Sequence, residues 1–118
     1  MMPFPVTILD SVDSTNAEAM RRIAGGERGP IWIMAREQTQ GRGRSGRAWM
    51  SVTGNHYASL LIGLDCKPAV AHHLSLVAGV GVVDAIREAA NPVEIAELRL
   101  KWPNDVLLNG KKICGTLL

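Results

Sequence analysis

Short alternating segments and two longer helical patterns organise most of the chain. Alternation of apolar and polar residues, or a short continuous apolar run, predicts a strand. The predicted strands are residues 4–10, 31–35, 57–64, 98–102, 106–108 and 113–118. Apolar residues at helical spacing predict helices at residues 15–24 and 69–90. Because Asn109-Gly110 separates the last two strands, we expect a tight hairpin there.

The two predicted helices carry their own end signals. Thr15 and Glu18 have the spacing of a capping box at the start of the first helix. Its apolar stripe consists of Ala17, Ala19, Met20 and Ile23. The second helix should stop at Pro92, and its Gly79 and Gly81 suggest close packing against a sheet.

The order of these elements predicts an α+β domain built on a mixed sheet. No repeat and no linker divides the chain, so we expect one domain over residues 1–118. The last predicted strand is still apolar where the sequence stops, and chain ends normally lie at the surface. We therefore expect the natural protein to continue past Leu118.

Composition places the chain among soluble globular proteins. It has 118 residues, 47% of them apolar, and a formal net charge of +2. No apolar run reaches the ~20 residues of a membrane span, and no basic segment precedes an apolar one at the N-terminus. Cys66 and Cys114 form no CxxC pair, which predicts neither a disulfide framework nor a thiolate metal cage. We expect a cytoplasmic protein without a membrane partner.

Positive charge is concentrated in residues 36–47. These residues overlap a polar stretch, residues 37–54, that is predicted to be a loop. Glycines and arginines alternate there in Gly41-Arg42-Gly43-Arg44-Ser45-Gly46-Arg47. Guanidinium groups form paired bonds with carboxylate or phosphate, so this pattern predicts a loop that folds over a small anion. Trp49 offers a flat face to a planar ligand, and Gln38 offers an amide. The alternative is a solvated or RNA-binding arginine-glycine segment.

The same loop formally matches the G-x-G-x-x-G pattern of dinucleotide-binding sites. An acidic residue, Asp65, even lies 19 residues beyond Gly46, as that pattern requires. The dinucleotide pattern, however, opens a helix directly after a strand. Because arginines fill the variable positions and no helical period follows, we expect a different kind of site.

Three further polar clusters carry candidate chemistry. Lys101-Trp102-Pro103-Asn104-Asp105 ends a predicted strand with a cation, an amide and a carboxylate, although a plain turn with Trp102 in the core fits equally well. Lys111-Lys112 follows the hairpin turn, where lysines also protect a strand edge. Ser14-Thr15-Asn16 is typical of a helix N-cap, whose hydroxyls and backbone N–H groups can also face a polar ligand.

The histidines and cysteines predict no metal site. His56, His72 and His73 lack a suitably spaced carboxylate or cysteine, which favours surface or core roles. Cys114 lies in an apolar strand, so inert burial is expected rather than nucleophilic catalysis. Neither a Ser-His-Asp arrangement nor a pair of carboxylates defines a hydrolytic site.

In their order and spacing these clusters resemble the biotin-protein ligase family, also called biotin–[acetyl-CoA-carboxylase] ligases. The resemblance runs from Ile8 to Leu118 and is carried by Ser14-Thr15-Asn16, Gln38, residues 41–49, residues 101–105, Lys112 and Gly115. Ser45 stands where an arginine is common, which should leave anion binding intact. The resemblance implies an α+β fold like that of class II aminoacyl-tRNA synthetases, with a mixed, largely antiparallel sheet and helices on one face, incomplete at its C-terminus.

The resemblance implies a reaction in two steps. Biotin and MgATP would give biotinyl-5′-AMP and pyrophosphate, and a lysine of a biotin carboxyl carrier protein would then take the biotinyl group. The implied partners are biotin, ATP and Mg²⁺, the carrier protein and a second copy of the chain in a homodimer. No helix-turn-helix segment and no SH3-like domain is expected within residues 1–118, so DNA is not an expected partner.

The resemblance also implies roles for individual residues. Biotin binding is implied for Ser14, Thr15, Asn16, Gln38, Gly41, Arg42, Gly43, Arg44, Lys112 and Gly115. ATP or adenylate binding is implied for Arg42, Arg44, Arg47, Trp49, Lys101, Asn104, Asp105 and Lys112. Lys112, at the biotin carboxylate and the α-phosphate, and Arg44 are the implied catalytic residues. Mg²⁺ would enter with ATP near Asp105, without a histidine or cysteine ligand.

Three other functions fit parts of the sequence. A lipoate-protein ligase would share the fold, although the arginine-glycine loop and the Lys-Trp-Pro-Asn-Asp turn favour biotin. A non-catalytic module that binds a small ligand would keep the loop but would show no biotin-dependent exchange of pyrophosphate with ATP. An RNA-binding protein is disfavoured by the near-neutral net charge and by a single phenylalanine and a single tyrosine.

Overall fold

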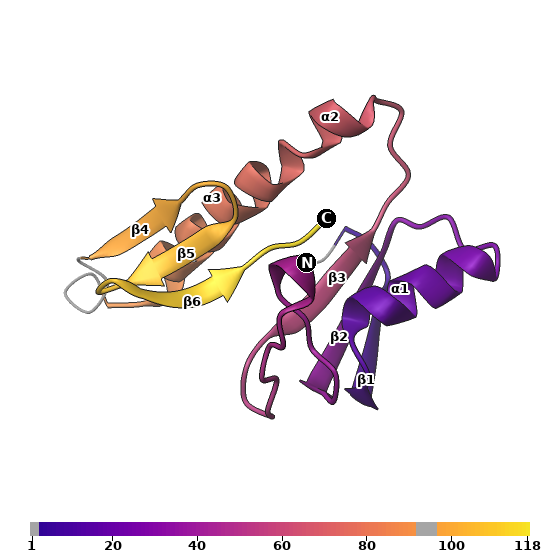
Figure 1. The fold of residues 1–118 in the computed structure, drawn as a ribbon, viewed down its shortest axis with the longest axis horizontal. Coiled ribbons are helices and arrows are strands. Elements are labelled where there is room, and N and C mark those ends of the chain that lie inside the picture. Colours follow the sequence, from indigo (N-terminus) through magenta and orange to yellow (C-terminus); the bar gives the residue numbers. More distant parts are fainter. Residues whose placement is uncertain (1–2, 92–96) are drawn as a thin grey trace. The chain divides into compact units, whose positions relative to one another are not determined.

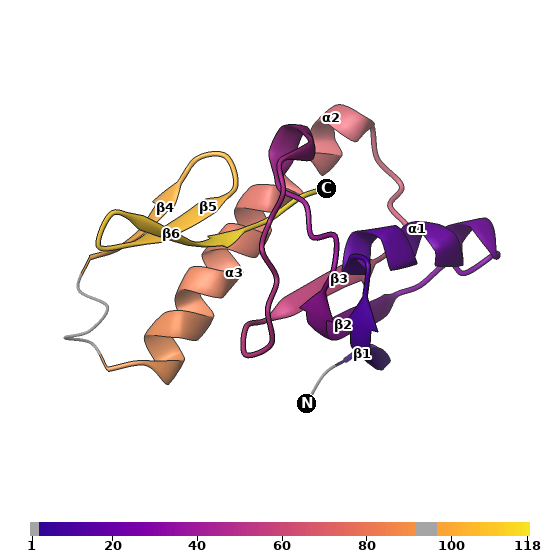
Figure 2. The same ribbon diagram turned by 60° about the horizontal axis from the view of Figure 1, so that its bottom comes forward.

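A computed structural model describes residues 3–91 and 97–118 and divides the chain into two compact units. Unit 1 comprises Met1–Leu64 and unit 2 comprises Asp65–Leu118 (Figures 1 and 2). The boundary falls just after a strand, at a position where no glycine-rich or charged stretch marks a linker in the sequence. The division into two units is therefore a property that the sequence pattern did not predict.

Unit 1 is a three-stranded sheet with one helix packed against it. Its elements are β1 (Val6–Val12), α1 (Thr15–Ala24), β2 (Ile31–Gln38), the 3-10 turn η1 (Arg44–Gly46) and β3 (Tyr57–Leu61). The central strand β2 is parallel to β1 and antiparallel to β3. A parallel pair needs a crossover connection, and α1 supplies it. Strand β2 runs three residues beyond the predicted end at Ala35, so that Gln38 closes it.

The sheet face under α1 carries the buried residues of unit 1. Ile33, Ala35 and Tyr57 are all less than a tenth exposed. Ile33 lies opposite Ser59 in the β2–β3 ladder, and the Ser59 hydroxyl reaches Thr15 in the first turn of α1. Because side chains alternate along a strand, Ile33 and Ala35 belong to the face that the helix covers.

The N-cap of α1 is Ser14, not Thr15. The Ser14 Oγ accepts a hydrogen bond from the backbone N–H of Ala17 at 3.1 Å. The capping-box prediction was therefore one residue late. Thr15 is 4% exposed and points its hydroxyl into unit 1, and the Glu18 carboxylate pairs with arginines of the next turn.

The two large side chains of the apolar stripe predicted on α1 are exposed. Met20 and Ile23 are 65% and 51% exposed. Residues seven apart share one face of a helix. Thr15 is buried, and Arg22, seven residues on, donates from Nη1 to Thr7 Oγ1 at 3.2 Å, so this side of the helix faces the sheet.

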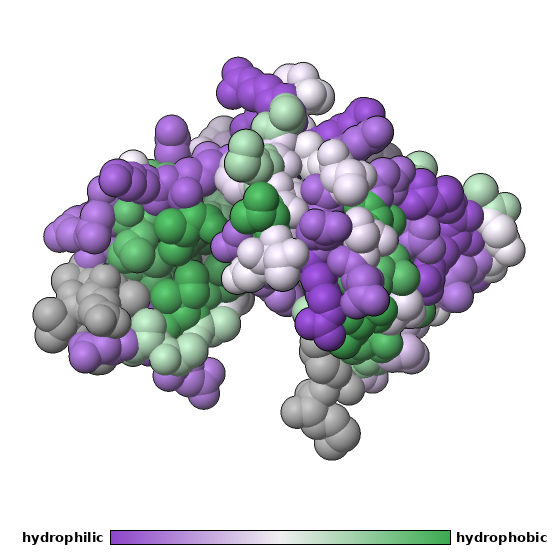
Figure 3. Space-filling model, turned by 90° about the horizontal axis from the view of Figure 1, so that it is seen from below, coloured by the Kyte–Doolittle hydropathy of each residue, from purple (hydrophilic) through white to green (hydrophobic). Residues whose placement is uncertain are grey.

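Unit 2 pairs a long helix with an antiparallel sheet. Its elements are α2 (Pro68–Ala71), α3 (Leu74–Ala89), β4 (Leu98–Lys101), β5 (Asp105–Leu108) and β6 (Lys111–Gly115). The middle strand is β5, and α3 contacts β4 and β5. Val83, Leu98 and Val106 form the buried cluster between helix and sheet. Figure 3 shows apolar side chains of this unit as a green area.

The hairpin between β5 and β6 is confirmed. Asn109 and Gly110 have φ angles of +51° and +78°. Two consecutive residues with positive φ are typical of the tight turns that match strand twist, and Asn-Gly is the pair that tolerates them best. The second strand ends at Gly115, three residues before its predicted end.

The predicted helix over residues 69–90 is two helices, because α2 ends before His72 and α3 begins after His73. Together they span Pro68–Ala89, which is long and apolar enough to cross a membrane on length and composition alone. The expectation that no segment reaches that length is therefore wrong by this measure. Core helices of soluble proteins pass the same test, so the absence of a membrane partner stays a prediction.

Gly79 and Gly81 have different surroundings in α3. A Cβ atom on Gly79 would lie 2.6 Å from Leu100 Cδ1, which confirms the predicted close packing of this residue against the sheet. A Cβ atom on Gly81 would meet nothing within 4 Å, so the same prediction is wrong for Gly81.

These surroundings make the two glycines a matched test of packing. We expect Gly81→Ala to raise the free energy of unfolding by up to about 1 kcal/mol through helix propensity. Gly79→Ala has the same propensity gain but must displace Leu100. It should be less stable than Gly81→Ala by about 1–3 kcal/mol. Urea unfolding of both variants measures the difference, and equal stabilisation would contradict the packing of α3 on β4.

The predicted fold class holds for the described residues. Parallel and antiparallel pairs both occur, and three of the four strand pairings described are antiparallel. Each sheet has a helix against it, α1 in unit 1 and α3 in unit 2. The strands form two three-stranded sheets, each within its own unit.

Candidate functional site

Buried polar side chains gather where α1 begins. The Thr15 backbone N–H donates to Gln38 Oε1 at 2.8 Å, and Thr15 Oγ1 donates to the same oxygen at 3.2 Å. Ser59 Oγ lies 2.8 Å from Thr15 Oγ1 and also contacts Asn16 Oδ1. Unit 1 therefore brings three predicted biotin-binding residues, Thr15, Asn16 and Gln38, into one network next to the N-cap Ser14.

Sequence reasoning did not single out Ser59 as a site residue. Its signal is a hydroxyl in an apolar strand, on the same face as the buried Tyr57 and Leu61. A buried hydroxyl needs a hydrogen-bond partner, and here the partner comes from 44 residues away in the sequence. Only the pairing of β2 with β3 brings Ser59 beneath the start of α1.

An ion-pair network anchors the first turns of α1. Arg21 Nη1 and Nη2 each donate to one oxygen of Asp13 at 2.8 Å, and Arg21 also pairs with Glu18. These hydrogen bonds from Arg21, helped by the backbone N–H of Ser14, hold the pKa of Asp13 well below its ordinary value. Hydrogen bonds from Arg22 and then Arg21 lower the pKa of Glu18.

The pKa of Asp13 is lower in the folded chain than in the unfolded chain, where it is about 4. The ionised carboxyl therefore stabilises the fold above about pH 4, and this stabilisation is lost as the pH falls through the folded-state pKa. We expect the Asp13 carboxyl to stay ionised at pH 3. Carbon NMR titration of that carboxyl measures this directly. Arg21→Ala should return the Asp13 pKa toward 4, whereas Arg28→Ala should leave it low. A wild-type Asp13 that titrates near pH 4 would contradict the network.

The arginine-glycine loop of unit 1 is closed by its own backbone. Gly43 N–H donates to the Arg47 carbonyl at 2.6 Å, and Trp49 N–H donates to the Gly41 carbonyl at 2.8 Å. At its tip Gly46 has a φ angle of +71°, a conformation that favours glycine. The three-residue turn η1 lies within the loop, and the next element described after it is the strand β3, which agrees with the rejection of the dinucleotide pattern.

The three loop arginines present their charges to solvent. Arg42, Arg44 and Arg47 are exposed, and no ion pair is recorded for them within residues 3–91 and 97–118. Trp49 is 36% exposed at the end of the loop. The loop therefore holds guanidinium groups that can bind an anion without first breaking an internal salt bridge.

A β-bulge in unit 2 decides the direction of Lys112. Val106 lies opposite Cys114, but the next residue, Leu107, lies opposite Lys112, so Ile113 is the extra residue of β6. In a regular strand Lys112 would share the core face with Cys114, two residues away. The bulge moves Lys112 to the other face of the sheet. No sequence signal predicted this irregularity.

On that face Lys112 meets two other predicted site residues. Its Nζ lies 2.9 Å from Asp105 Oδ1. Gly115 is opposite Asp105, and a Cβ atom on Gly115 would lie 3.0 Å from Lys112 Cε. The absence of a side chain at Gly115 thus leaves room for the lysine. Lys101, the cross-strand partner of Asp105 on its other side, is exposed.

The turn before β5 orients an amide and exposes a tryptophan. Asn104 is 5% exposed, and its Nδ2 donates to the Thr116 carbonyl at 2.8 Å. Its Oδ1 is buried and has no hydrogen-bond partner within the described part of the chain. Trp102 is 75% exposed, so the alternative with Trp102 in the core is wrong.

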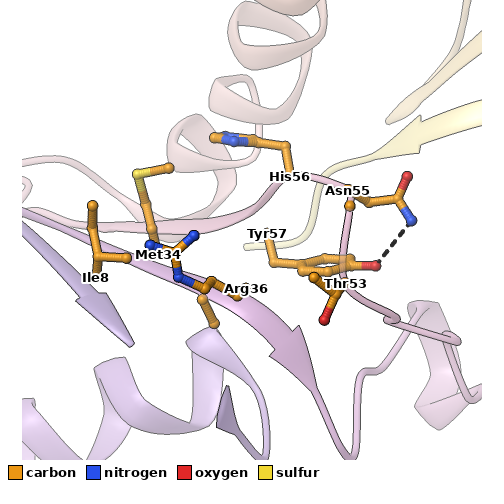
Figure 4. A pocket seen from close by; sticks show the side chains of 9 residues that line it. Ile8, Met34, Arg36, Thr53, Asn55, His56 and Tyr57 are labelled. Atoms are coloured by element: carbon orange, nitrogen blue, oxygen red, sulfur yellow. Dashed lines mark hydrogen bonds between the residues drawn. The ribbon is translucent and has the colours of Figure 1, made fainter. Parts of the chain in front are cut away.

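In the part of the chain that the structure describes, the remaining candidate groups give no second site. A hollow of about 390 Å³ in unit 1 is lined by Ile8, Met34, Ala35, Arg36, Thr53, Gly54, Asn55, His56 and Tyr57 (Figure 4). It contains no predicted site residue, and the Tyr57 hydroxyl is already bonded to Val52 O and Asn55 Nδ2. No group of three His, Cys, Asp or Glu residues that could hold a metal occurs in residues 3–91 and 97–118. Burial raises the pKa of the Cys114 thiol, which agrees with an inert role.

Comparison with known proteins gives one consistent answer. The profile of the biotin/lipoate A/B protein ligase family matches residues 9–118. The chain is 46% identical over 111 residues to the biotin–[acetyl-CoA-carboxylase] ligase of Paracoccus denitrificans. This alignment covers 94% of the chain and 45% of that ligase.

Solved structures of biotin protein ligases are similar in fold. The biotin protein ligase from Leishmania major in complex with biotinyl-5-AMP matches with a TM-score of 0.77 and 32% identity, over 98% of this chain and 52% of that one. The biotin protein ligase from Aquifex aeolicus in complex with biotin and ATP matches with a TM-score of 0.73 and 33% identity, over 96% and 45%. The chain spans about half the length of each of these three relatives.

Proposed function

This chain belongs to the biotin/lipoate A/B protein ligase family, and we propose that it forms the N-terminal part of the catalytic domain of a cytoplasmic biotin–[acetyl-CoA-carboxylase] ligase. The observation that carries the proposal is the polar network at the start of α1, which is built on the buried Thr15 and Ser59 and lies in the same unit as an exposed arginine loop. A solvated or RNA-binding loop would not require such a network in the neighbouring strand and helix.

The network suits the head group of biotin. The ureido ring of biotin carries one carbonyl acceptor and two N–H donors, so it needs partners of both kinds. Thr15, Asn16 and Gln38 provide hydroxyl and amide groups, and Ser14 adds a hydroxyl at the N-cap. We assign these four residues to the biotin ring. Two structural relatives are described in complexes with biotin and ATP or with biotinyl-5-AMP, which supports this choice of ligand.

The cationic residues suit the first reaction step. In that step a biotin carboxylate oxygen bonds to the α-phosphorus of ATP, and the bond to pyrophosphate breaks. Both reactants are anions, so fixed positive charge lowers the barrier. We assign Lys112 to the carboxylate and the α-phosphate. Arg42, Arg44 and Arg47 are assigned to the adenylate phosphate, with Trp49 against adenine.

The turn residues of unit 2 fit a hard cation. Asp105 offers a carboxylate, and Asn104 offers a buried amide oxygen without a partner in the described residues. Carboxylate and amide oxygens are ligands that Mg²⁺ accepts, and Mg²⁺ usually arrives with nucleotide phosphates. Asp105 and Asn104 would hold such an ion, which would neutralise phosphate charge. Lys101, the cross-strand partner of Asp105 in β4, is assigned to the nucleotide phosphates.

The second step would pass biotin to a carrier protein. The amine of a carrier lysine would bond to the biotinyl carbonyl carbon, and AMP would leave. We propose a biotin carboxyl carrier protein as the acceptor, in line with the carboxylase named for the Paracoccus denitrificans relative.

Calorimetric titration of biotin into the purified chain, with and without MgATP, tests the proposal. A thermal melt beforehand establishes that the chain is folded. We expect saturable binding of biotin and further heat, with exchange of pyrophosphate, when MgATP is present. Lipoate, titrated in parallel, should give no comparable signal.

Each other result points to another function. A folded chain that binds lipoate but not biotin would make it a lipoate-protein ligase segment. Biotin binding without pyrophosphate exchange would make it a binding module. A chain that does not fold would contradict the expectation that residues 1–118 bind biotin and exchange pyrophosphate on their own.

A further inference from the structure

Ser51 lies just beyond the arginine-glycine loop and is almost completely buried. It is 5% exposed, although serine is a small polar residue in a polar stretch of the sequence. Its backbone carbonyl accepts from the Gln38 N–H at 3.0 Å, which closes the base of the loop. Its hydroxyl makes two further hydrogen bonds, one with the Gln38 side chain and one with the Trp49 carbonyl.

The two hydroxyl bonds have a fixed direction. The Trp49 carbonyl can only accept, so Ser51 Oγ must donate to it, at 2.9 Å. The hydroxyl then has lone pairs to offer, and Gln38 Nε2 donates to it at 3.0 Å. Ser51 thus relays one chain of hydrogen bonds from the Gln38 side chain to the backbone at the end of the loop.

This relay sets the orientation of the Gln38 amide. A glutamine side chain can turn its oxygen and nitrogen either way unless its neighbours decide. On one side the Thr15 backbone N–H is a donor only, so Gln38 Oε1 faces it at 2.8 Å. On the other side Ser51 accepts from Nε2. The two neighbours therefore require the same orientation, and among the described residues no bond is seen for the second Nε2 hydrogen.

The close fit around the hydroxyl supports a positioning role. A Cβ atom on Gly41 would collide with Ser51 Oγ and with the Trp49 carbonyl, and would lie 3.0 Å from Gln38 Nε2. Gly41 therefore leaves the space that Ser51 fills. The sequence only places this glycine in a polar loop, whereas the structure gives it a packing reason.

We propose that Ser51 is a positioning residue that orients the Gln38 amide toward the ligand and ties that amide to the loop end at Trp49. The proposal rests on the proposed function for the ligand, because Gln38 is assigned to the biotin ring. It assigns no contact between Ser51 and biotin.

The test combines Ser51→Ala, which removes the hydroxyl, with Ser51→Thr, which keeps it. Ser11→Ala is the matched control, because Ser11 is exposed in β1 and outside the network. We expect Ser51→Ala to shift the side-chain amide NMR signals of Gln38 and to weaken biotin binding about tenfold, the effect of one buried donor left unpaired. Ser51→Thr should restore most of both, and Ser11→Ala should change neither.

A double variant separates positioning from general loss of structure. If Ser51 acts through Gln38, adding Ser51→Ala to Gln38→Ala should change biotin affinity by less than about twofold. The proposal would be overturned if the losses of biotin affinity in the two single variants multiplied in the double variant. Unchanged Gln38 signals in Ser51→Ala would also overturn it. This holds even if Ser51→Thr is too large for the site.

The NMR readout needs no ligand, so it distinguishes two failures. If the wild-type chain does not bind biotin, the proposed function fails. The response of the Gln38 amide to Ser51→Ala still decides whether Ser51 positions Gln38.

Discussion

Lys112→Ala is expected to slow formation of the biotinyl adenylate by about 100- to 1000-fold, the usual cost of losing one fixed donor at a reacting centre. The bulge at Ile113 turns Lys112 away from the core, and Asp105 Oδ1 holds its ammonium at 2.9 Å. A charge held in place before the reaction stabilises negative charge without reorganising. Biotin-dependent exchange of pyrophosphate into ATP measures the rate of this step.

Lys111→Ala is the matched control for this prediction. It removes the same charge from the preceding residue, which lies opposite Leu108 beside the turn. Exchange should stay within about twofold of wild type, as expected for a surface change. Lys112→Arg keeps a positive charge and shows how much depends on ammonium geometry. A thermal melt is needed because Lys112→Ala leaves Asp105 without this ion pair. Equal loss in both alanine variants, or none in Lys112→Ala, would refute the assignment.

Arg44→Ala is expected to speed the release of biotinyl-5′-AMP by about 10- to 100-fold, with a smaller effect on its formation. A charge-assisted bond between guanidinium and phosphate contributes roughly this much when its partner is removed. Arg44 is exposed at the start of η1, and the structure records no internal ion pair for it within the described ranges. Chromatography of free adenylate that escapes into solution measures retention.

Arg28→Ala provides the comparison for Arg44. Arg28 is an exposed arginine of the same unit, outside the loop, so this variant has the same change in net charge. It should retain the adenylate as the wild type does. Raising the salt concentration should weaken retention in the wild type more than in Arg44→Ala, because exposed charge interactions are screened. Arg44→Ala with unchanged retention would remove the arginine loop from the adenylate site.

The two variants also separate the two roles from each other. Lys112→Ala should impair formation, and Arg44→Ala should impair retention. If both variants formed the adenylate slowly but retained it normally, Lys112 and Arg44 would both act in adenylate formation. Normal behaviour in both would remove the proposed site altogether.

Several parts of the fold were predictable because their causes are local. Asn109-Gly110 predicts its turn through the φ angles that these two residues tolerate, and the structure has those angles. Helix α1 has the predicted range, residues 15–24, and its N-cap was predicted to within one residue, because serine and threonine caps act over three or four positions. The arginine loop was recognisable from its glycines and arginines, and the absence of an apolar period there excludes a regular helix or strand.

Other parts depend on partners far away in the sequence. The capping box was placed one residue too far along the chain. The Thr15 hydroxyl is hydrogen-bonded to Gln38 and Ser59 instead of capping the helix, and local spacing does not reveal these partners. The apolar stripe does not show which side of α1 faces the sheet, because Met20 is exposed and the polar side with Thr15 and Arg22 packs there.

The sequence by itself determined which residue types are present at the site and in what order, and this was enough to identify the family. Only the tertiary structure decided how they are oriented. Strand pairing placed Ser59 under Thr15, and loop closure placed Ser51 between Gln38 and Trp49. One extra residue in β6 set the face on which Lys112 lies. The physical reason is that hydrogen bonds and strand register join residues distant in sequence, whereas residue pattern records only what neighbours along the chain prefer.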